Sequence, residues 1–454
     1  MKPKRILLVG AGHVGLYVAL RLLKKLSRRR AEIVVVDPQP HMTYQPFLPE
    51  AAAGSISPRH CVAPLRRVLR GCEILAGSVT RIEHSRKVAV VQPITGPARE
   101  LSYDEIVVAP GSVSRALPIP GLKEFAVGFK TIGEAIWLRN HVLSSLDIAA
   151  ATNDPATRQR ALTFVLVGGG YAGIEAIAEL EDMARDAVRY YPELRAEDMR
   201  WVLVEATRRI LPEVDPDMGA YTVRQLLERK LDIRLETRLE SCVDGHVVLS
   251  DGEEFDTDTV VWTAGVKPHP MLEDTDLPRD DKGRVTCLPT LQAVNADGDV
   301  LDGAWSAGDC AAVPDLTADD PGALCSPSAQ HAVRQARRLA DNIVAKLKGR
   351  PIVEYKHKHA GSVASLGLHR GVAQVYGIKL RGIVAWFMHR TYHLSRIPTF
   401  NRKVRVVLDW TLALLLRREV VSLGQLHQPR ESFSAYAPSA RPPANGRAPS
   451  PETR

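Results

Sequence analysis

Two glycine-rich segments with the same surroundings constrain the fold more than any other feature of this chain. GAGHVG stands at residues 10–15 after the apolar run ILLV, and GGGYAG stands at residues 168–173 after FVLV. Each is followed by a segment with helical spacing of apolar residues, and then by a second apolar run that ends in an acid. The chain is therefore expected to contain two strand–turn–helix–strand units of the kind that binds a dinucleotide.

The glycines of each segment have separate structural roles. The first permits a tight turn, the second lets the backbone approach a pyrophosphate, and the third lets the helix pack closely on the strand. Unpaired N–H groups at the helix N-terminus then point at the anion. The expected dinucleotide-binding glycines are Gly10, Gly12 and Gly15 in the first segment and Gly168, Gly170 and Gly173 in the second.

An acid follows each segment at the end of the next strand. Asp37 comes 22 residues after the last glycine, where a carboxylate can accept both ribose hydroxyls of an adenosine. Glu205 comes 32 residues after its last glycine, which we attribute to a longer helix over roughly 172–198. Its carboxylate favours NADH because it would repel the 2′-phosphate of NADPH, although Arg208 and Arg209 would weaken that preference. One site is expected to hold a flavin and the other to receive a nicotinamide.

Length, charge and cysteine usage narrow the class of protein. The 454 residues exceed what one hydrophobic core usually holds, so two or three domains are expected. The net charge of +8 invites an anionic partner, but no nucleic-acid-binding module is visible, and nucleic acid is not expected. The six cysteines form no C-x-x-C pair and no metal-ligand spacing, which predicts no metal site and a reducing, cytoplasmic compartment. No signal peptide and no membrane-spanning helix are expected.

A resemblance to a known family covers nearly the whole chain. It rests on segments that include YQPFLPEAAAGSISP, YDEIVVAPGS, GGGYAGIEAIAEL, VVWTAGV, WSAGDCA, AQHAVRQ and NRKVRVVLDW. From about residue 4 to 428 the chain resembles the type II NADH dehydrogenases, which are single-subunit NADH:quinone oxidoreductases of the two-dinucleotide-domain flavoproteins. The resemblance implies an α/β fold with two Rossmann-like domains, one for FAD and one for NAD(H), and a C-terminal amphipathic segment that associates with the membrane.

The same resemblance implies a division of the chain. The FAD-binding domain is expected in two parts, at 1–118 and 289–350, with the NAD(H)-binding domain at 119–288 between them. A membrane or dimer segment is expected at 351–428. The remaining residues, 429–454, contain six prolines and little apolar content, and this composition predicts a disordered tail.

Further flavin-binding residues are implied by the family pattern. Gly308 and Asp309 follow an apolar strand, and in the superfamily this aspartate approaches the ribityl and pyrophosphate region of the flavin at the start of a helix. The other residues expected to line the flavin are Gln45, Pro46, Ala109, Gly111 and Gly265.

Glu175 stands two residues after the last glycine of the second segment, in the first turn of the expected helix. The resemblance places it at the junction of nicotinamide and flavin, where a fixed negative charge steers electron transfer. The alternative is a carboxylate that only complements the helix dipole.

The segment SPSAQHAVRQ supplies the expected quinone-binding residues. In the family, a helix of this kind lines the quinone pocket, which implies contacts from Ala329, Gln330 and Gln335. A glutamine amide can hydrogen-bond a quinone carbonyl without supplying redox chemistry. Gln330 is therefore expected to act in catalysis together with Glu175. A solvated helix face is the alternative, and His331 and Arg334 depart from the family pattern, which leaves the acceptor open.

The C-terminal segment combines apolar and basic residues. GIVAWFMHRTYHLSRIPTF and RVVLDWTLALLLRRE are too short and too charged to span a bilayer. They are expected to lie in the membrane interface, with Trp386, Phe387 and Trp410 at its boundary and basic side chains near lipid phosphates. A helix pair packed on the flavin domain, or a dimer interface, stays open as an alternative.

The expected activity is transfer of a hydride from NADH to FAD and then of electrons to a membrane quinone, without proton pumping. The implied partners are the quinone, anionic inner-leaflet lipid and a second copy of the chain, and the implied location is the cytoplasmic face of the cell membrane. A soluble NAD(P)H oxidase or reductase with another acceptor, or a slow-turnover flavin and NADH sensor, stays open. A disulfide reductase is disfavoured, because residues 41–60 contain no cysteine.

Overall fold

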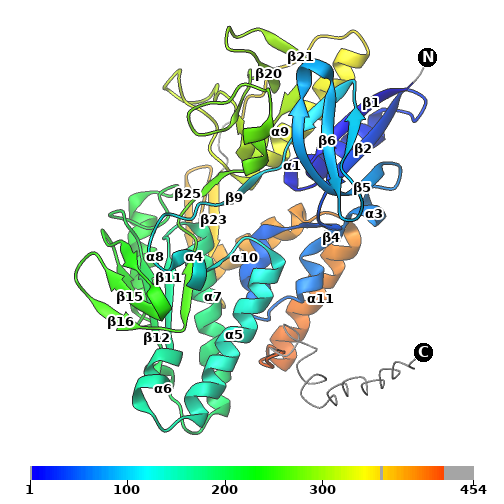
Figure 1. The fold of residues 1–454 in the computed structure, drawn as a ribbon. Helices are drawn as coiled ribbons and strands as arrows, with labels where there is room; N and C mark the ends of the chain where they lie inside the picture. Colours follow the sequence, from blue (N-terminus) through cyan, green and yellow to red (C-terminus); the bar gives the residue numbers. More distant parts are fainter. Residues whose placement is uncertain (1–2, 358–360, 424–454) are drawn as a thin grey trace, which may run out of the picture.

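Two sheets, one above the other in Figure 1, form the framework of the molecule in the computed structural model, which describes residues 3–357 and 361–423. The first has eight strands in the order β20-β21-β8-β1-β2-β5-β6-β7, and the second has five in the order β10-β17-β11-β12-β13. The tail expected at 429–454 lies outside the described residues.

The first sheet grows from the first glycine segment. β1 and β2 are buried apolar runs that pair in parallel, and β1 also pairs in parallel with β8. β21 returns from late in the chain and pairs in parallel with β8, so this sheet joins the two parts of the expected flavin domain. Its strands are β1 (Lys4–Val9), β2 (Ala31–Asp37), β5 (Glu73–Glu83), β6 (Val88–Pro93), β7 (Arg99–Ser102), β8 (Glu105–Val108), β20 (Gln292–Val294) and β21 (Val300–Ser306).

The second sheet grows from the second glycine segment and is parallel throughout. Its central strand, with the sequence TFVLV, is buried at every position, as expected for a strand covered on both faces. The strands are β10 (Val127–Gly128), β11 (Thr163–Val167), β12 (Arg200–Val204), β13 (Asp232–Arg234) and β17 (Thr259–Trp262).

Short ribbons connect and extend these units, and all are antiparallel except the parallel pair of β19 and β22. β9 follows β8 of the first sheet along the chain, and β18 follows β17 of the second. The two pair with each other where the chain crosses between the units. The remaining strands are β3 (His41–Thr43), β4 (Val62–Pro64), β9 (Ser112–Ser114), β14 (Leu239–Ser241), β15 (His246–Leu249), β16 (Glu254–Asp256), β18 (Val266–Pro268), β19 (Val285–Thr286), β22 (Ala311–Ala312), β23 (Gly361–Ser365), β24 (Gly371–Val375) and β25 (Ile378–Arg381).

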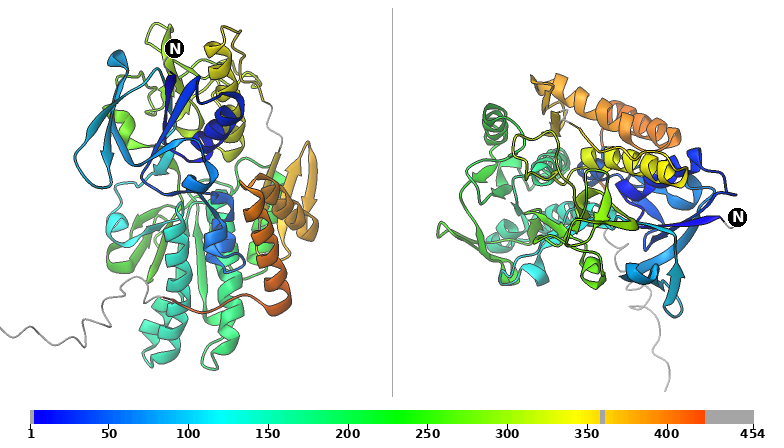
Figure 2. Two further views of the ribbon diagram at one scale, coloured as in Figure 1. Left: turned by 90° about the vertical axis from the view of Figure 1, so that its right-hand side faces the viewer. Right: turned by 90° about the horizontal axis from the view of Figure 1, so that it is seen from above.

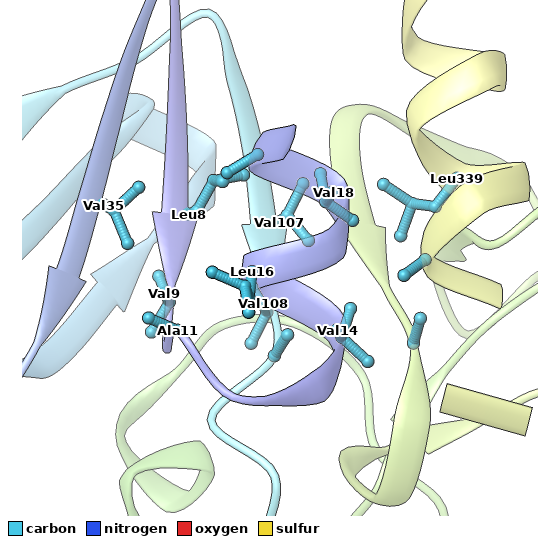
Figure 3. Close-up of a cluster of buried hydrophobic side chains, with 14 of the residues drawn as sticks. Leu8, Val9, Ala11, Val14, Leu16, Val18, Val35, Val107, Val108 and Leu339 are labelled. Carbon is cyan, nitrogen blue, oxygen red and sulfur yellow. The ribbon is translucent and has the colours of Figure 1, made fainter. Parts of the chain in front are cut away.

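Helices cover both sheets. Figure 3 shows the helix after the first glycine turn lying between the sheet and the later helix that carries Leu339. The helix after the second turn ends at Ala187 rather than near 198, because Pro192 follows closely and disfavours helical backbone before it. The helices are α1 (His13–Lys25), α2 (Leu48–Ala52), α3 (Leu65–Val68), α4 (Leu122–Phe125), α5 (Ile132–Ala151), α6 (Pro155–Ala161), α7 (Tyr171–Ala187), α8 (Pro216–Leu227), α9 (Ala329–Leu347), α10 (Gly382–Arg396) and α11 (Phe400–Leu416).

The C-terminal helices α10 and α11 lie together along one flank of the molecule, shown in orange in Figure 2. The structure corrects the expectation for their tryptophans. Trp386 is buried, and the guanidinium of Arg390 lies 4.0 Å from the centre of its ring and 4.8 Å from that of Trp410, so both rings face the protein. Phe387 is 58% exposed, as expected. Within the described part of the chain, neither helix nor any other is long and apolar enough to cross a bilayer.

Candidate functional site: two glycine turns and two adjoining cavities

The first glycine turn has the backbone that its sequence predicts. Gly10 has φ +90°, and a Cβ added to Gly15 would lie 1.9 Å from the carbonyl oxygen of Gly10. A Cβ on Gly12 would meet no atom within 4 Å, so the turn is open on the side where a ligand would approach. Asp37 ends β2, and its carboxylate accepts hydrogen bonds from the backbone N–H groups of Ala11 and Gln39, both at 2.7 Å. Burial raises the pKa of Asp37.

A cavity of about 930 Å³ opens in front of this turn, and we call it the cofactor cavity. It brings together all but three of the residues that the sequence assigns to the flavin. Gly15 instead packs against the carbonyl of Gly10, and Pro46 and Gly265 line a neighbouring cavity. The predicted residues that line the cofactor cavity are Gly10, Gly12, Asp37, Gln45, Ala109, Gly111, Gly308 and Asp309.

Asp309 enters the cofactor cavity from the turn that follows β21. Its Oδ2 accepts a hydrogen bond of 2.6 Å from Oγ of Ser112, which in turn accepts one of 2.6 Å from Nζ of Lys130. Burial lowers the pKa of Lys130. A cavity lined by a glycine turn, an acid at the end of the next strand and a half-buried Lys–Ser–Asp row fits a dinucleotide such as FAD.

Gln335 is not where the sequence predicts it. Its side chain is 1% exposed and points from α9 into the protein, where Oε1 accepts a hydrogen bond of 2.8 Å from the N–H of Gly308. It lines neither this cavity nor its neighbour. The spacing is the reason: Gln335 is five residues after Gln330 and therefore lies on another face of the helix. Gln335 supports the turn that carries Asp309.

The second glycine turn repeats the geometry of the first. Gly168 has φ +115°, and a Cβ on Gly173 would lie 1.9 Å from the carbonyl oxygen of Gly168. A Cβ on Gly170 would meet nothing within 4 Å. Glu205 directly follows β12, and its carboxylate accepts hydrogen bonds from the N–H groups of Gly169, at 2.6 Å, and Thr207, at 2.8 Å.

A second cavity, of about 400 Å³, lies between this turn and the cofactor cavity, and we call it the junction cavity. From the second unit it receives Glu175 and Gly265, and from α9 it receives Ala329 and Gln330. The two cavities adjoin, since the same five residues line both: His13, Gln45, Ser114, Lys130 and Ala329. A group bound in the cofactor cavity would therefore be reached from the junction cavity.

Glu175 is more than a carboxylate at a helix terminus. It is 7% exposed, and its Oε1 accepts a hydrogen bond of 2.9 Å from the N–H of Ser365 and lies 3.0 Å from Nε2 of His389. Both partners come from the C-terminal part of the chain. The side chain thus lines the junction cavity while it joins α7 to β23 and α10.

Gln330 lies at the start of α9, which Ser328 caps by accepting a hydrogen bond from the N–H of His331. The amide Nε2 of Gln330 donates to the carbonyl of Gly361 at 3.1 Å, and its Oε1 lies 3.1 Å from Nε2 of His357. Its amide is therefore oriented by the chain at the wall of the junction cavity.

Several residues of the junction cavity were not predicted from the sequence. His13 occupies a variable position of the first glycine segment, and burial lowers its pKa to about 4. Tyr44 donates or accepts a hydrogen bond of 3.0 Å at Nδ1 of His393, and burial lowers the pKa of His393 well below its ordinary value. The position of His13 inside the motif was a usable signal, whereas His393 reaches the cavity only through tertiary packing.

The fold and the two turns define a class, the flavin- and nicotinamide-binding oxidoreductases with two dinucleotide domains. The family model described as pyridine nucleotide-disulphide oxidoreductase matches residues 4–336. The chain belongs to this family.

Curated relatives and solved structures narrow the comparison, and they confirm the resemblance to the type II enzymes. The chain is 28% identical to the type II NADH:quinone oxidoreductase Ndh of Mycobacterium tuberculosis, over 93% of this chain and 89% of that protein. It is 28% identical to the type II NADH:quinone oxidoreductase of Staphylococcus epidermidis, over 85% and 93%. The structure of NDH2 from Plasmodium falciparum in complex with NADH superimposes with a TM-score of 0.84 at 16% identity, over 93% of this chain and all of that one, and shares the fold.

Proposed function

We propose that the protein is an NADH:quinone oxidoreductase of type II, which passes a hydride from NADH to FAD and then electrons to a membrane quinone, without pumping protons. The observation that carries the proposal is the junction cavity, which touches the second glycine turn, α9 and the cofactor cavity at once. A nicotinamide and a quinone can thus both reach one flavin. The type II relatives, which align over most of the chain, support the same activity.

FAD would lie in the cofactor cavity. The N-terminus of α1 and its glycine turn would bind the pyrophosphate, and Asp37 would accept the ribose hydroxyls. Asp309, held by Ser112, would orient the ribityl end toward the junction cavity. The flavin supplies acceptance and release of an electron pair, and the protein supplies position and electrostatics.

NADH would bind across the second turn. Glu205 has the length and the place to accept the adenosine ribose hydroxyls, and it opposes a 2′-phosphate. The nicotinamide would reach the junction cavity beside Glu175, whose buried negative charge favours departure of hydride from NADH, because NAD⁺ carries the additional positive charge.

The quinone would enter the junction cavity beside α9. Ala329 and Val333 offer apolar contacts there, and Gln330 offers its amide to a quinone carbonyl. Gly361 and His357 orient that amide at the wall of the cavity. Among the described residues no cysteine lines either cavity, which counts against thiol chemistry and leaves the flavin as the electron donor to the acceptor.

The exposed face of α10 and α11 would bind the cytoplasmic face of the membrane as a peripheral surface, with anionic lipid near its basic residues. The apolar residues of this face are Ile383, Val384, Phe387, Phe400, Val404, Val407, Leu408, Leu412, Leu414, Leu415 and Leu416.

We expect the double variant L415Q/L416Q to lose co-sedimentation with anionic vesicles and to keep its flavin. L227Q, at an exposed leucine of α8, is the control. The protein is also expected to form a homodimer, and analytical ultracentrifugation of the purified protein would measure its oligomeric state.

Stopped-flow spectroscopy of the purified flavoprotein tests the activity. NADH should bleach the bound flavin within milliseconds to seconds, and a short-chain quinone should restore its colour. Reduction by NADH followed by negligible reoxidation would exclude the quinone reductase and favour a sensor. Reoxidation only by oxygen would favour a soluble oxidase.

A further inference from the structure

A buried cluster of ionisable side chains lies directly behind Glu175. Glu50 from α2, Glu179 from α7 and His389 from α10 are each 1% exposed. Oε1 of Glu179 accepts a hydrogen bond of 2.8 Å from Oγ of Ser365, and Oε2 of Glu50 accepts one of 2.5 Å from Nε1 of Trp410. Nδ1 of His389 and Oε1 of Glu50 have no hydrogen-bond partner among the described residues.

Without a bound proton, this cluster would carry two uncompensated negative charges, and a proton on His389 halves that excess. Three carboxylates, those of Glu50, Glu175 and Glu179, face one permanent cation, Arg390, whose Nη2 lies 3.4 Å from Glu50. Uncompensated charge is costly in the protein interior. Burial by itself lowers the pKa of His389, but the charges of Glu175, Glu50 and Glu179 outweigh burial, and its pKa is raised. Burial also raises the pKa of Glu50.

The cluster reaches the junction cavity through Glu175. Nε2 of His389 lies 3.0 Å from Oε1 of the carboxylate that lines the cavity. On its other side the ring of His389 meets that of His393, with centres 4.5 Å apart. The groups that face His389 are therefore Glu175 and Glu179 from α7, Glu50 from α2, and Arg390 and His393 from α10.

We infer that His389 stores a proton behind Glu175 and supplies it to the reduced acceptor in the junction cavity. The inference deepens the proposed function and rests on it. NADH brings two electrons and one proton, whereas reduction of a quinone to a hydroquinone takes two electrons and two protons, so one proton must come from elsewhere. That proton leaves Nε2 of His389 for Oε1 of Glu175, and Glu175 passes it to the acceptor oxygen. Neutral His389 then recovers a proton from water, and no electron passes through either residue.

The pH dependence of two half-reactions tests this inference. In the wild-type flavoprotein, reoxidation by a short-chain quinone should slow as the pH rises through the raised pKa of His389, because the store empties. The variant H389Q should reoxidise about 100-fold more slowly below that pH and should lose the pH dependence. Reduction of its flavin by NADH should change less than about threefold. H84Q, at another buried histidine that lines neither cavity, is the matched control and should keep the wild-type profile.

A purely structural role for His389 would give a different result. It would slow both half-reactions together and leave the pH profile of reoxidation unchanged, and this outcome would overturn the inference. If H389Q fails to retain flavin, E175Q takes its place, and a wild-type profile in E175Q would be equally decisive. Proton uptake during reoxidation, followed with an indicator dye, gives an independent readout that should be delayed in H389Q. Absence of reoxidation in the wild type would instead refute the proposed function.

Discussion

The turn at Gly10 and the turn at Gly168 have the same backbone geometry, yet they open onto different surroundings. In both, the third glycine packs against the carbonyl of the first, and an acid from the next strand binds the N–H group of the residue after that first glycine. The first turn faces a cavity of about 930 Å³ that α9 and the turn after β21 help to close. The second is followed by exposed residues after Glu205. The turn thus fits a dinucleotide in either place, and we expect the enclosed turn to retain its dinucleotide and the exposed one to exchange it.

The largest effect should come from the third glycine of each turn. A Cβ at 1.9 Å from a backbone oxygen cannot be accommodated without displacing the helix from the strand. We expect G15A to yield protein without flavin, whereas G173A should retain flavin and lose about 100-fold or more in the rate of reduction by NADH. Absorbance at the flavin band and stopped-flow reduction measure the two. Equal loss of flavin in both variants would contradict a division of labour between the turns.

His13 and Tyr171 stand at the fourth position of the two segments. Of the two, only His13 should make the stability of the protein depend on pH between 4 and 6.5. The pKa of His13 is lowered to about 4 by burial, against 6.5 in the unfolded chain. Between these values the unfolded state binds more protons, so stability should fall as the pH drops from 6.5 toward 4, by up to about 3 kcal/mol. H13Q should flatten this decline in the melting temperature. Y171F should not, because burial raises the pKa of Tyr171 and keeps it protonated.

Glu205 and Asp37 should affect different ligands: Glu205 should set the preference for NADH over NADPH, and Asp37 should help to retain the flavin. E205Q removes the charge that opposes a 2′-phosphate and weakens a charge-assisted hydrogen bond, so kcat/KM for NADH should fall about 10- to 30-fold while that for NADPH rises. D37N, the matched change at the first turn, should weaken flavin retention and leave the NADH to NADPH ratio within about twofold. Steady-state kinetics with both nucleotides measures this ratio. An unchanged ratio in E205Q would remove the acid from cofactor selection.

The smallest effect is expected at Arg208. Its side chain is 89% exposed and pairs with Glu236 at 3.0 Å, a surface ion pair that contributes little. R208A should therefore change KM for NADH less than about threefold, with a somewhat larger increase for NADPH if the arginine contacts a 2′-phosphate. A tenfold rise in KM for NADH would show that NADH binding at the second turn depends on Arg208 as well as on Glu205.

The parts of the site that the sequence predicts are those encoded by short-range patterns. Both glycine turns, their acids and the approach of Asp309 follow from apolar runs, glycine spacing and the family pattern. The partners of Glu175 do not, since Ser365 stands 190 residues away and only folding brings it close. The sequence predicts Trp386 and Trp410 at a membrane boundary because aromatic residues favour that position, but Arg390 between their rings holds both inward. The position of Gln335 on its helix explains why it does not line the junction cavity. Because it follows Gln330 by five residues, its side chain points toward Gly308.

The return of β21 to β8 has a consequence for synthesis on the ribosome. The second sheet is complete once β17 (Thr259–Trp262) has emerged, whereas the first lacks β20 and β21 until residues 292–306 follow. Domains generally fold as units, beginning during translation. The later-encoded half of the molecule can thus mature before the one that starts at the N-terminus. Flavin insertion should come near the end of chain elongation, and nascent chains arrested before β21 should bind nicotinamide nucleotide without turning yellow.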